Sequence, residues 1–146
     1  MNEEEIKILS IGIVSSRFNN EIVEKISKAC ILKLQALGVS EKKIIHKTVP
    51  GALEIPIALQ KMNKCEIFDV MIAIGLVIRG DTYHFEIVSN ESASGILRVQ
   101  LDYSIPIINA VLTTNSSKEA LARVVIKGEE AAEGAIEMAL KIYHND

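Results

Sequence analysis

The segment from Phe68 to Ile78 reads FDVMIAIGLVI and is apolar at almost every position. A strand that is buried on both faces has this composition, and such strands occur in parallel sheets that carry helices on each side. The segment therefore predicts a central parallel strand in an α/β fold.

Short β-branched runs and helical patterns alternate along the rest of the chain. The further strand candidates are Ile8–Val14, Ile44–Val49 and Ile105–Thr113. The helical patterns are Glu21–Leu37, Ile55–Asn63, Thr82–Leu101 and Ser116–Tyr143. Strands that alternate with helices predict a parallel sheet between two helix layers, with right-handed crossovers. We therefore expect a three-layer α/β/α sandwich around a four-stranded parallel sheet, flavodoxin-like in class.

Two of the helical patterns contain residues that should shape them. Ser116 with Glu119 forms a capping box at the start of the last helical region. Gly95 weakens the interior of the Thr82–Leu101 helix. We expect the last helical region to break or bend near Gly128, because glycine disfavours a helix interior.

Length and composition exclude several classes of protein. The 146 residues suit one domain, which we expect to span residues 1–146. The net charge is −3 and the basic residues are dispersed, so we expect no nucleic-acid partner. No apolar run reaches the roughly 18 to 20 residues of a membrane span, and the acidic start MNEEEIK differs from a targeting signal. Cys30 and Cys65 fit no zinc or redox spacing and suit a reducing compartment, so together with the absence of a targeting signal they favour a cytoplasmic location.

Polar residues gather after each predicted strand. The four loops are SSRFNN (Ser15–Asn20), VPGALE (Val49–Glu54), GLVIRGDTYH (Gly75–His84) and TTNSS (Thr113–Ser117). In open α/β sheets, ligands bind beyond the carboxyl ends of the strands. We therefore expect these loops to line one pocket.

The loop that ends at His84 carries the residues best suited to chemistry. Gly80 would let a ligand approach the backbone, and Asp81 and Thr82 would begin a helix whose N–H groups attract an anion such as phosphate. Alternatively, Gly80 only turns the chain and Asp81 or Thr82 caps the helix. His84, in the first turn, either exchanges protons as a neutral ring or lies on the helix surface.

Three other residues near strand ends allow two interpretations each. Arg79 binds an anion or forms an orienting ion pair with a nearby carboxylate. Phe18 stacks on a flat ligand ring or packs in the core. Glu54 accepts hydrogen bonds from a ligand N–H or caps the helix that follows it. The sequence has no metal-ligand spacing, no serine-nucleophile elbow and no dinucleotide or triphosphate fingerprint.

Several motifs occur together and in order along the chain. They are RFNN (17–20), VPGALEIP (49–56), GLVIRGDTYHFE (75–86), AVLTT (110–114) and KGEEAA (127–132). In this combination the chain resembles the 6,7-dimethyl-8-ribityllumazine synthase family from about Ile8 to Tyr143. The PGAxE and VIRGxTxH elements are the most specific part of the resemblance.

The resemblance implies a transferase that condenses 5-amino-6-(D-ribitylamino)uracil with 3,4-dihydroxy-2-butanone 4-phosphate, the penultimate step of riboflavin biosynthesis. It implies no redox cofactor and no essential metal. By the same resemblance, His84 would transfer protons. The substrate-binding residues of the same chain would be Phe18, Ala52, Leu53, Glu54, Leu76, Val77, Ile78, Asp81 and Thr82. A neighbouring chain would contribute Asn109, Arg123 and Lys127.

The resemblance also implies a homo-oligomer, either a pentamer or an icosahedral shell of twelve pentamers, with sites shared between subunits. Riboflavin synthase is a candidate partner. Two features depart from the family pattern: many relatives carry an aromatic residue in place of Asn109, and the segment from Arg123 to Lys127 is shorter than the family's loop.

These departures leave open a ligand-binding or shell-forming relative with weakened catalysis. A flavodoxin-like or receiver-type signalling module is a further alternative. It lacks support, because the clustered acidic residues of a receiver's metal site are missing from the end of the first predicted strand.

Overall fold

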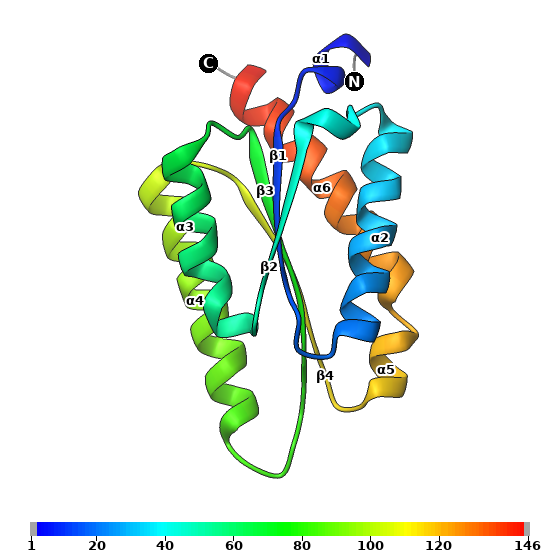
Figure 1. Cartoon of the computed structure of the whole chain (residues 1–146), viewed down its shortest axis with the longest axis vertical. Coiled ribbons are helices and arrows are strands. Elements are labelled where there is room, and N and C mark those ends of the chain that lie inside the picture. The colour runs from blue at the N-terminus through cyan, green and yellow to red at the C-terminus, as the bar shows by residue number, and fades with distance from the viewer. Residues whose placement is uncertain (1–2, 145–146) are drawn as a thin grey trace.

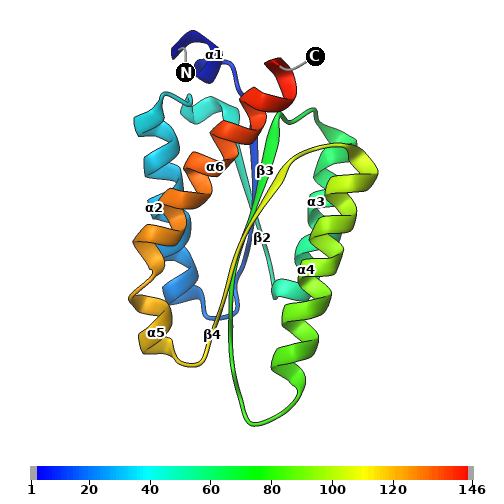
Figure 2. The same cartoon turned by 180° about the vertical axis from the view of Figure 1, so that it is seen from behind.

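The structure is a computed structural model and describes residues 3–144. A four-stranded, all-parallel sheet in the order β2-β1-β3-β4 lies between two layers of helices (Figures 1 and 2). The strands are β1 (Ile11–Ser16), β2 (Ile44–Val49), β3 (Val70–Ile78) and β4 (Ile107–Thr114). The helices are α1 (Glu3–Lys7), α2 (Asn20–Leu37), α3 (Ile55–Cys65), α4 (His84–Tyr103), α5 (Ser117–Leu121) and α6 (Val124–His144), with short 3₁₀ turns η1 (Glu41–Lys43) and η2 (Ala52–Glu54). The predicted α/β/α class is confirmed.

The two faces of the sheet carry separate apolar cores. Helices α2 and α6 cover one face and α3 and α4 the other (Figure 1). Along β3, Ile72 and Ile74 pack in the α2 and α6 core, whereas Met71 and Ala73 pack in the α3 and α4 core. Successive side chains of a strand point to opposite faces, so an apolar run was needed to fill both cores. The strand is therefore buried as its composition predicted.

Strand boundaries differ from the predictions by a few residues. β1 begins at Ile11 instead of Ile8 and extends to Ser16, since pairing with both neighbouring strands starts at Ile11. Ile8 is 70% exposed and lies before this pairing. β4 begins at Ile107 because Pro106 has no N–H to donate to a ladder. Sequence analysis missed α1, which is too short to show a helical period.

Two glycines lie at close helix contacts. α4 passes through Gly95 without a break, and a Cβ there would lie 2.6 Å from Cγ of Pro56 in α3. α6 likewise runs through Gly128, so the helical region predicted to break or bend near this residue has no break there. A Cβ at Gly128 would lie 2.6 Å from the carbonyl oxygen of Ile26 in α2. The interruption instead falls between α5 and α6, after Leu121.

Candidate active site

A cavity of about 510 Å³ opens at the carboxyl ends of the strands, beside the start of α4. The predicted residues that line it are Phe18, Ala52, Leu53, Glu54, Leu76, Val77, Ile78, Thr82 and His84. They follow β1, precede α3, end β3 and begin α4, and a parallel sheet brings these points to one edge (Figure 1). The loop from Thr113 to Ser117 contributes no lining residue, so the expectation of four loops around one pocket is wrong for the fourth loop.

Hydrogen bonds join the loops at the rim of this cavity. The N–H of Phe18 donates to the carbonyl of Pro50 at 3.0 Å. The side-chain amide of Asn19 donates to the carbonyl of Leu76 at 3.3 Å. Asn19 has φ 62, a left-handed conformation that asparagine tolerates better than most residues. Phe18 is 70% exposed at this rim, so the core interpretation of its ring is wrong.

Glu54 lies at the end of η2, immediately before α3. Its side chain makes no capping hydrogen bond to α3, which contradicts the capping interpretation. A Cβ at Gly51 would lie 3.1 Å from Oε1 of Glu54, so the carboxylate lies close above the Gly51 backbone. Both residues line the cavity, where the carboxylate can accept hydrogen bonds from a ligand.

The start of α4 carries His84 as its first helical residue, two residues later than predicted. The N–H of His84 donates to Oγ1 of Thr82 at 3.3 Å. The backbone at Gly80 faces open space, because a Cβ there would meet no atom within 4 Å. Asp81 is exposed but does not line the cavity. An exposed backbone turn before a helix suits an anion, and the adjacent imidazole suits proton transfer.

Sequence analysis missed several lining residues, among them Phe85 and Val88. Val88 lies four positions after His84 and so shares its face of α4, whereas Phe85 is simply the next residue in the chain. Helical spacing from His84 could have identified Val88 but not Phe85. The titratable side chains that line the cavity within the described part of the chain are Glu54 and His84.

Comparison with known proteins identifies the family. A family model for 6,7-dimethyl-8-ribityllumazine synthase matches residues 8–142. The chain is 56% identical over 131 residues to the 6,7-dimethyl-8-ribityllumazine synthase of Paraburkholderia phymatum, across 90% of this chain and 76% of that protein. The proteins of the same name from Burkholderia mallei and Burkholderia pseudomallei are 55% identical across the same shares. The chain belongs to the 6,7-dimethyl-8-ribityllumazine synthase family.

Membership of this family makes the chain a transferase of riboflavin biosynthesis. The family and the activity inferred from the motifs are thereby confirmed. The matches lend no support to a catalytically weakened relative. They also lend none to a signalling module.

Two of the residues that the lumazine synthase resemblance assigns to a neighbouring chain lie on a different part of the molecule. Asn109 is exposed on β4, an edge strand of the sheet. With Lys127 and Glu130 it lines a hollow of about 130 Å³ between β4 and α6. Neither Asn109 nor Lys127 lines the large cavity.

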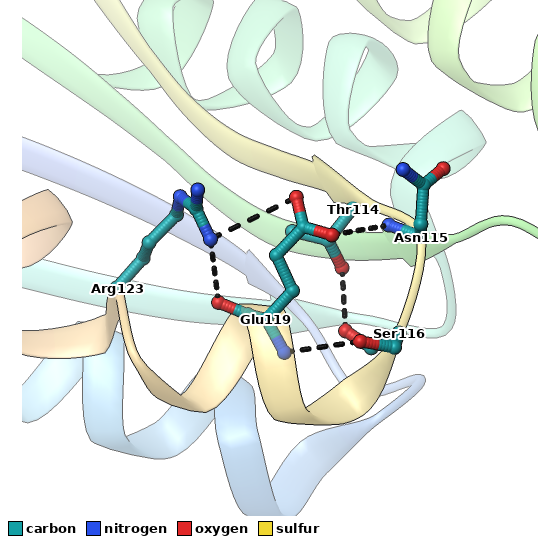
Figure 3. A network of polar contacts seen from close by, with 5 residues as sticks. All are labelled: Thr114, Asn115, Ser116, Glu119 and Arg123. Atoms are coloured by element: carbon teal, nitrogen blue, oxygen red, sulfur yellow. Dashed lines mark hydrogen bonds and ion pairs between the residues drawn. The ribbon is translucent and has the colours of Figure 1, made fainter.

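Arg123, the third such residue, lies between α5 and α6 in a local polar network (Figure 3). Its Nη1 donates to the carbonyl of Glu119 at 2.9 Å and lies 3.7 Å from Oε1 of the same residue. The N–H of Glu119 donates to Oγ of Ser116, as the capping box predicts. The carboxylate of Glu119, however, accepts from the N–H of Asn115 instead of closing the box at Ser116. Arg123 is 53% exposed and remains open to a further partner.

The described residues contain no group of three or more His, Cys, Asp or Glu side chains that could hold a metal ion. Between residues 3 and 144, no helix has the length and apolar character needed to cross a bilayer. Cys30 and Cys65 are both free thiols. Burial raises the pKa of the Cys30 thiol to about 12, so this thiol stays protonated and packs as an apolar group.

Proposed function

We propose that the large cavity is the site at which the chain condenses 5-amino-6-(D-ribitylamino)uracil with 3,4-dihydroxy-2-butanone 4-phosphate. The products are 6,7-dimethyl-8-ribityllumazine, phosphate and water. The observation that carries the proposal is the meeting of an exposed aromatic ring, a carboxylate and an imidazole around one cavity. These belong to Phe18, Glu54 and His84, from three separate parts of the chain.

The pyrimidine substrate fits the apolar side of the cavity. Phe18 stacks on its flat ring, and Glu54 accepts a hydrogen bond from a ring N–H. The volume of about 510 Å³ lies within the range usual for small-molecule sites. The uracil and ribityl groups lie against the walls formed by Ala52, Leu53, Leu76, Val77 and Ile78.

The phosphate of the second substrate lies at the start of α4. Thr82 lines the cavity there, and the helix dipole favours negative charge. Asp81 does not line the cavity and its carboxylate would repel a phosphate, so the proposal assigns it no contact with this substrate. Arg123 and Lys127 of the partner subunit would supply positive charge, since no Arg or Lys of the same chain lines the cavity within its described residues.

His84 transfers protons between the two bound molecules. Imine formation, phosphate elimination and ring closure each require a proton to be removed from one atom and delivered to another. Holding the two reactants in contact supplies most of the rate, because orientation replaces a bimolecular encounter. One imidazole at the cavity wall then suffices as general acid and base.

The proposal includes an assembly in which subunits share sites. An exposed Phe18 and the distance of Asn109 from the large cavity fit a site that a neighbouring copy completes. A pentamer or a shell of twelve pentamers, and riboflavin synthase as a partner, remain part of the proposal. We also propose that residues 1–146 form one domain. A cytoplasmic location is part of the proposal too, because free thiols such as those of Cys30 and Cys65 are typical of a reducing compartment.

Mixing the purified protein with the two substrates tests the proposal. Absorbance of the lumazine product should rise faster than in the spontaneous condensation. A rate no higher than that background would refute the proposed synthase activity. Tight binding of a ribityl-pyrimidine in calorimetry, without turnover, would instead favour a binding protein. Light scattering on the same sample measures the size of the assembly.

Substitution Phe18→Ala should weaken binding of a ribityl-pyrimidine by about 1 kcal/mol or more, because a stacked ring is lost. Stability should change by less than about 0.5 kcal/mol, since Phe18 is 70% exposed. Tyr83 is a matched control, because it is 69% exposed but does not line the cavity. Calorimetry should show normal affinity for Tyr83→Ala; equal losses in both variants would exclude a specific role for Phe18.

A further inference from the structure

Arg79 joins three elements at the edge of the sheet that holds the cavity. It follows β3, and its N–H donates to the carbonyl of Thr114 at the end of β4, at 2.8 Å. Its Nε donates to Oδ1 of Asn115 at 3.1 Å, and its Nη1 to Oε1 of Glu86 in α4 at 2.5 Å. The guanidinium carbon also lies 4.3 Å from the centre of the Phe85 ring. The side chain therefore fastens the first turn of α4 to the end of β4.

Phe85 and Val88 pack the start of α4 against the α3 and α4 core. Within the described residues, however, Arg79 makes the only polar side-chain contact that joins the first turn of α4 to another element. Residues 79–83 form an exposed connection, and the residue before the helix, Tyr83, makes no side-chain capping bond. The bond from His84 to Thr82 lies within the same connection and ties it to no other element. Yet this turn carries His84 and Phe85, which both line the cavity. Small shifts of the turn would therefore move the imidazole.

We propose that Arg79 is a positioning residue, which sets the place of His84 by holding Glu86 and Phe85 of the same helical turn against the end of β4. The inference rests on the proposed function of the cavity. Arg79 itself does not line the cavity, and both of its bonded nitrogens point to protein partners. Its hydrogen bond holds the pKa of the Glu86 carboxyl below the usual value, so Glu86 stays ionised as a partner.

Arg79→Gln tests the inference through kinetics. Turnover should fall roughly 10- to 100-fold, because a misplaced catalytic group costs rate even when it is present. The Michaelis constants and the melting temperature should change little, since an exposed ion pair contributes little to stability. Arg79→Lys should recover part of the rate, because lysine retains the charge for Glu86 but cannot also reach Asn115 in the same geometry.

Arg98→Gln is the matched control. Arg98 forms an exposed pair with Asp102 on the same helix, with Nε 3.5 Å from Oδ2, and lies away from the cavity. Its loss should leave turnover unchanged. An equal loss of turnover in both variants, or a fall in the melting temperature that accounts for the loss in Arg79→Gln, would overturn the positioning role.

Repeating the Arg79→Gln substitution in a His84→Ala protein shows whether Arg79 positions His84 or contacts the substrate directly. If Arg79 acts through His84, Arg79→Gln should cause no further loss of turnover in a His84→Ala protein. A rise in the Michaelis constant for the phosphorylated substrate in both backgrounds would instead make Arg79 an anion ligand and overturn the inference.

Amide hydrogen exchange of residues 84–88 gives a readout that needs no activity. Exchange of these amides should accelerate in Arg79→Gln but not in Arg98→Gln. Unchanged exchange in Arg79→Gln would refute the proposal that Arg79 holds the first turn of α4. If the wild-type protein lacked synthase activity, the proposed function would fail. The exchange result would still decide whether Arg79 holds this turn.

Discussion

Replacement of His84 by alanine should lower turnover roughly a hundredfold, the lower end of what a general acid–base residue supplies. The loss is expected to be modest because orientation of the two substrates is retained. The protein should stay folded, since the side chain is exposed at the first position of α4 and no described residue hydrogen-bonds to its ring. Steady-state absorbance of the lumazine product measures the rate, and the melting temperature verifies the fold.

Two further variants make the His84 experiment specific. His84→Gln keeps a polar side chain but cannot transfer protons, so it should be nearly as slow as alanine. His46→Gln should keep full activity, because His46 lies on β2 outside the cavity and its Nε2 is 2.7 Å from Oγ of Ser15. Desolvation lowers the pKa of the His46 imidazole. Unchanged turnover in His84→Ala would remove this residue from the mechanism.

The fold class and the grouping of residues around the large cavity could be predicted from the sequence for the same physical reason. An apolar run such as Phe68–Ile78 has few alternatives to a doubly covered strand, and parallel strands must place their carboxyl ends together. Residues as far apart as Phe18, Glu54 and His84 therefore gather without any contact being known beforehand. Helix and strand limits were less well predicted because caps and pairing partners decide them.

What the sequence could not provide depends on partners elsewhere in the fold. Arg79 allowed both an anion ligand and an ion pair, and only the packed structure shows Glu86, Phe85 and Asn115 around it. Asp81 could not be separated from Thr82 as a lining residue, because the choice depends on the local path of the turn. The role proposed for Arg123 requires a second subunit, which no feature of a single chain positions.

Gly128 is another residue whose role depends on a distant partner. A glycine within a helical pattern can have two opposite effects on the helix. As a local feature it weakens a helix, whereas at a helix crossing it permits close approach of a second backbone. In α6 a Cβ at this position would lie 2.6 Å from the carbonyl oxygen of Ile26 and 2.9 Å from the backbone nitrogen of Cys30. Both atoms belong to the backbone of α2, which cannot rotate away as a side chain could.

Gly128→Ala should therefore destabilise the protein by about 2 kcal/mol or more, as overpacking against a fixed backbone does. The penalty outweighs the gain in helix propensity of about 1 kcal/mol that alanine offers over glycine. Urea unfolding followed by circular dichroism measures the change. Variants must be compared at equal protein concentration, because the proposed assembly of subunits would make apparent stability concentration-dependent.

Gly134→Ala supplies the matched control within the same helix. A Cβ at Gly134 would lie 3.5 Å from Cδ1 of Ile108, an ordinary contact distance, so only the propensity gain applies. This variant should be more stable than wild type by about 0.5 to 1 kcal/mol. Because both substitutions sit inside α6 and change the same atoms, their difference isolates the contact between α2 and α6. Equal shifts in the two variants would mean that Gly128 serves no close helix contact.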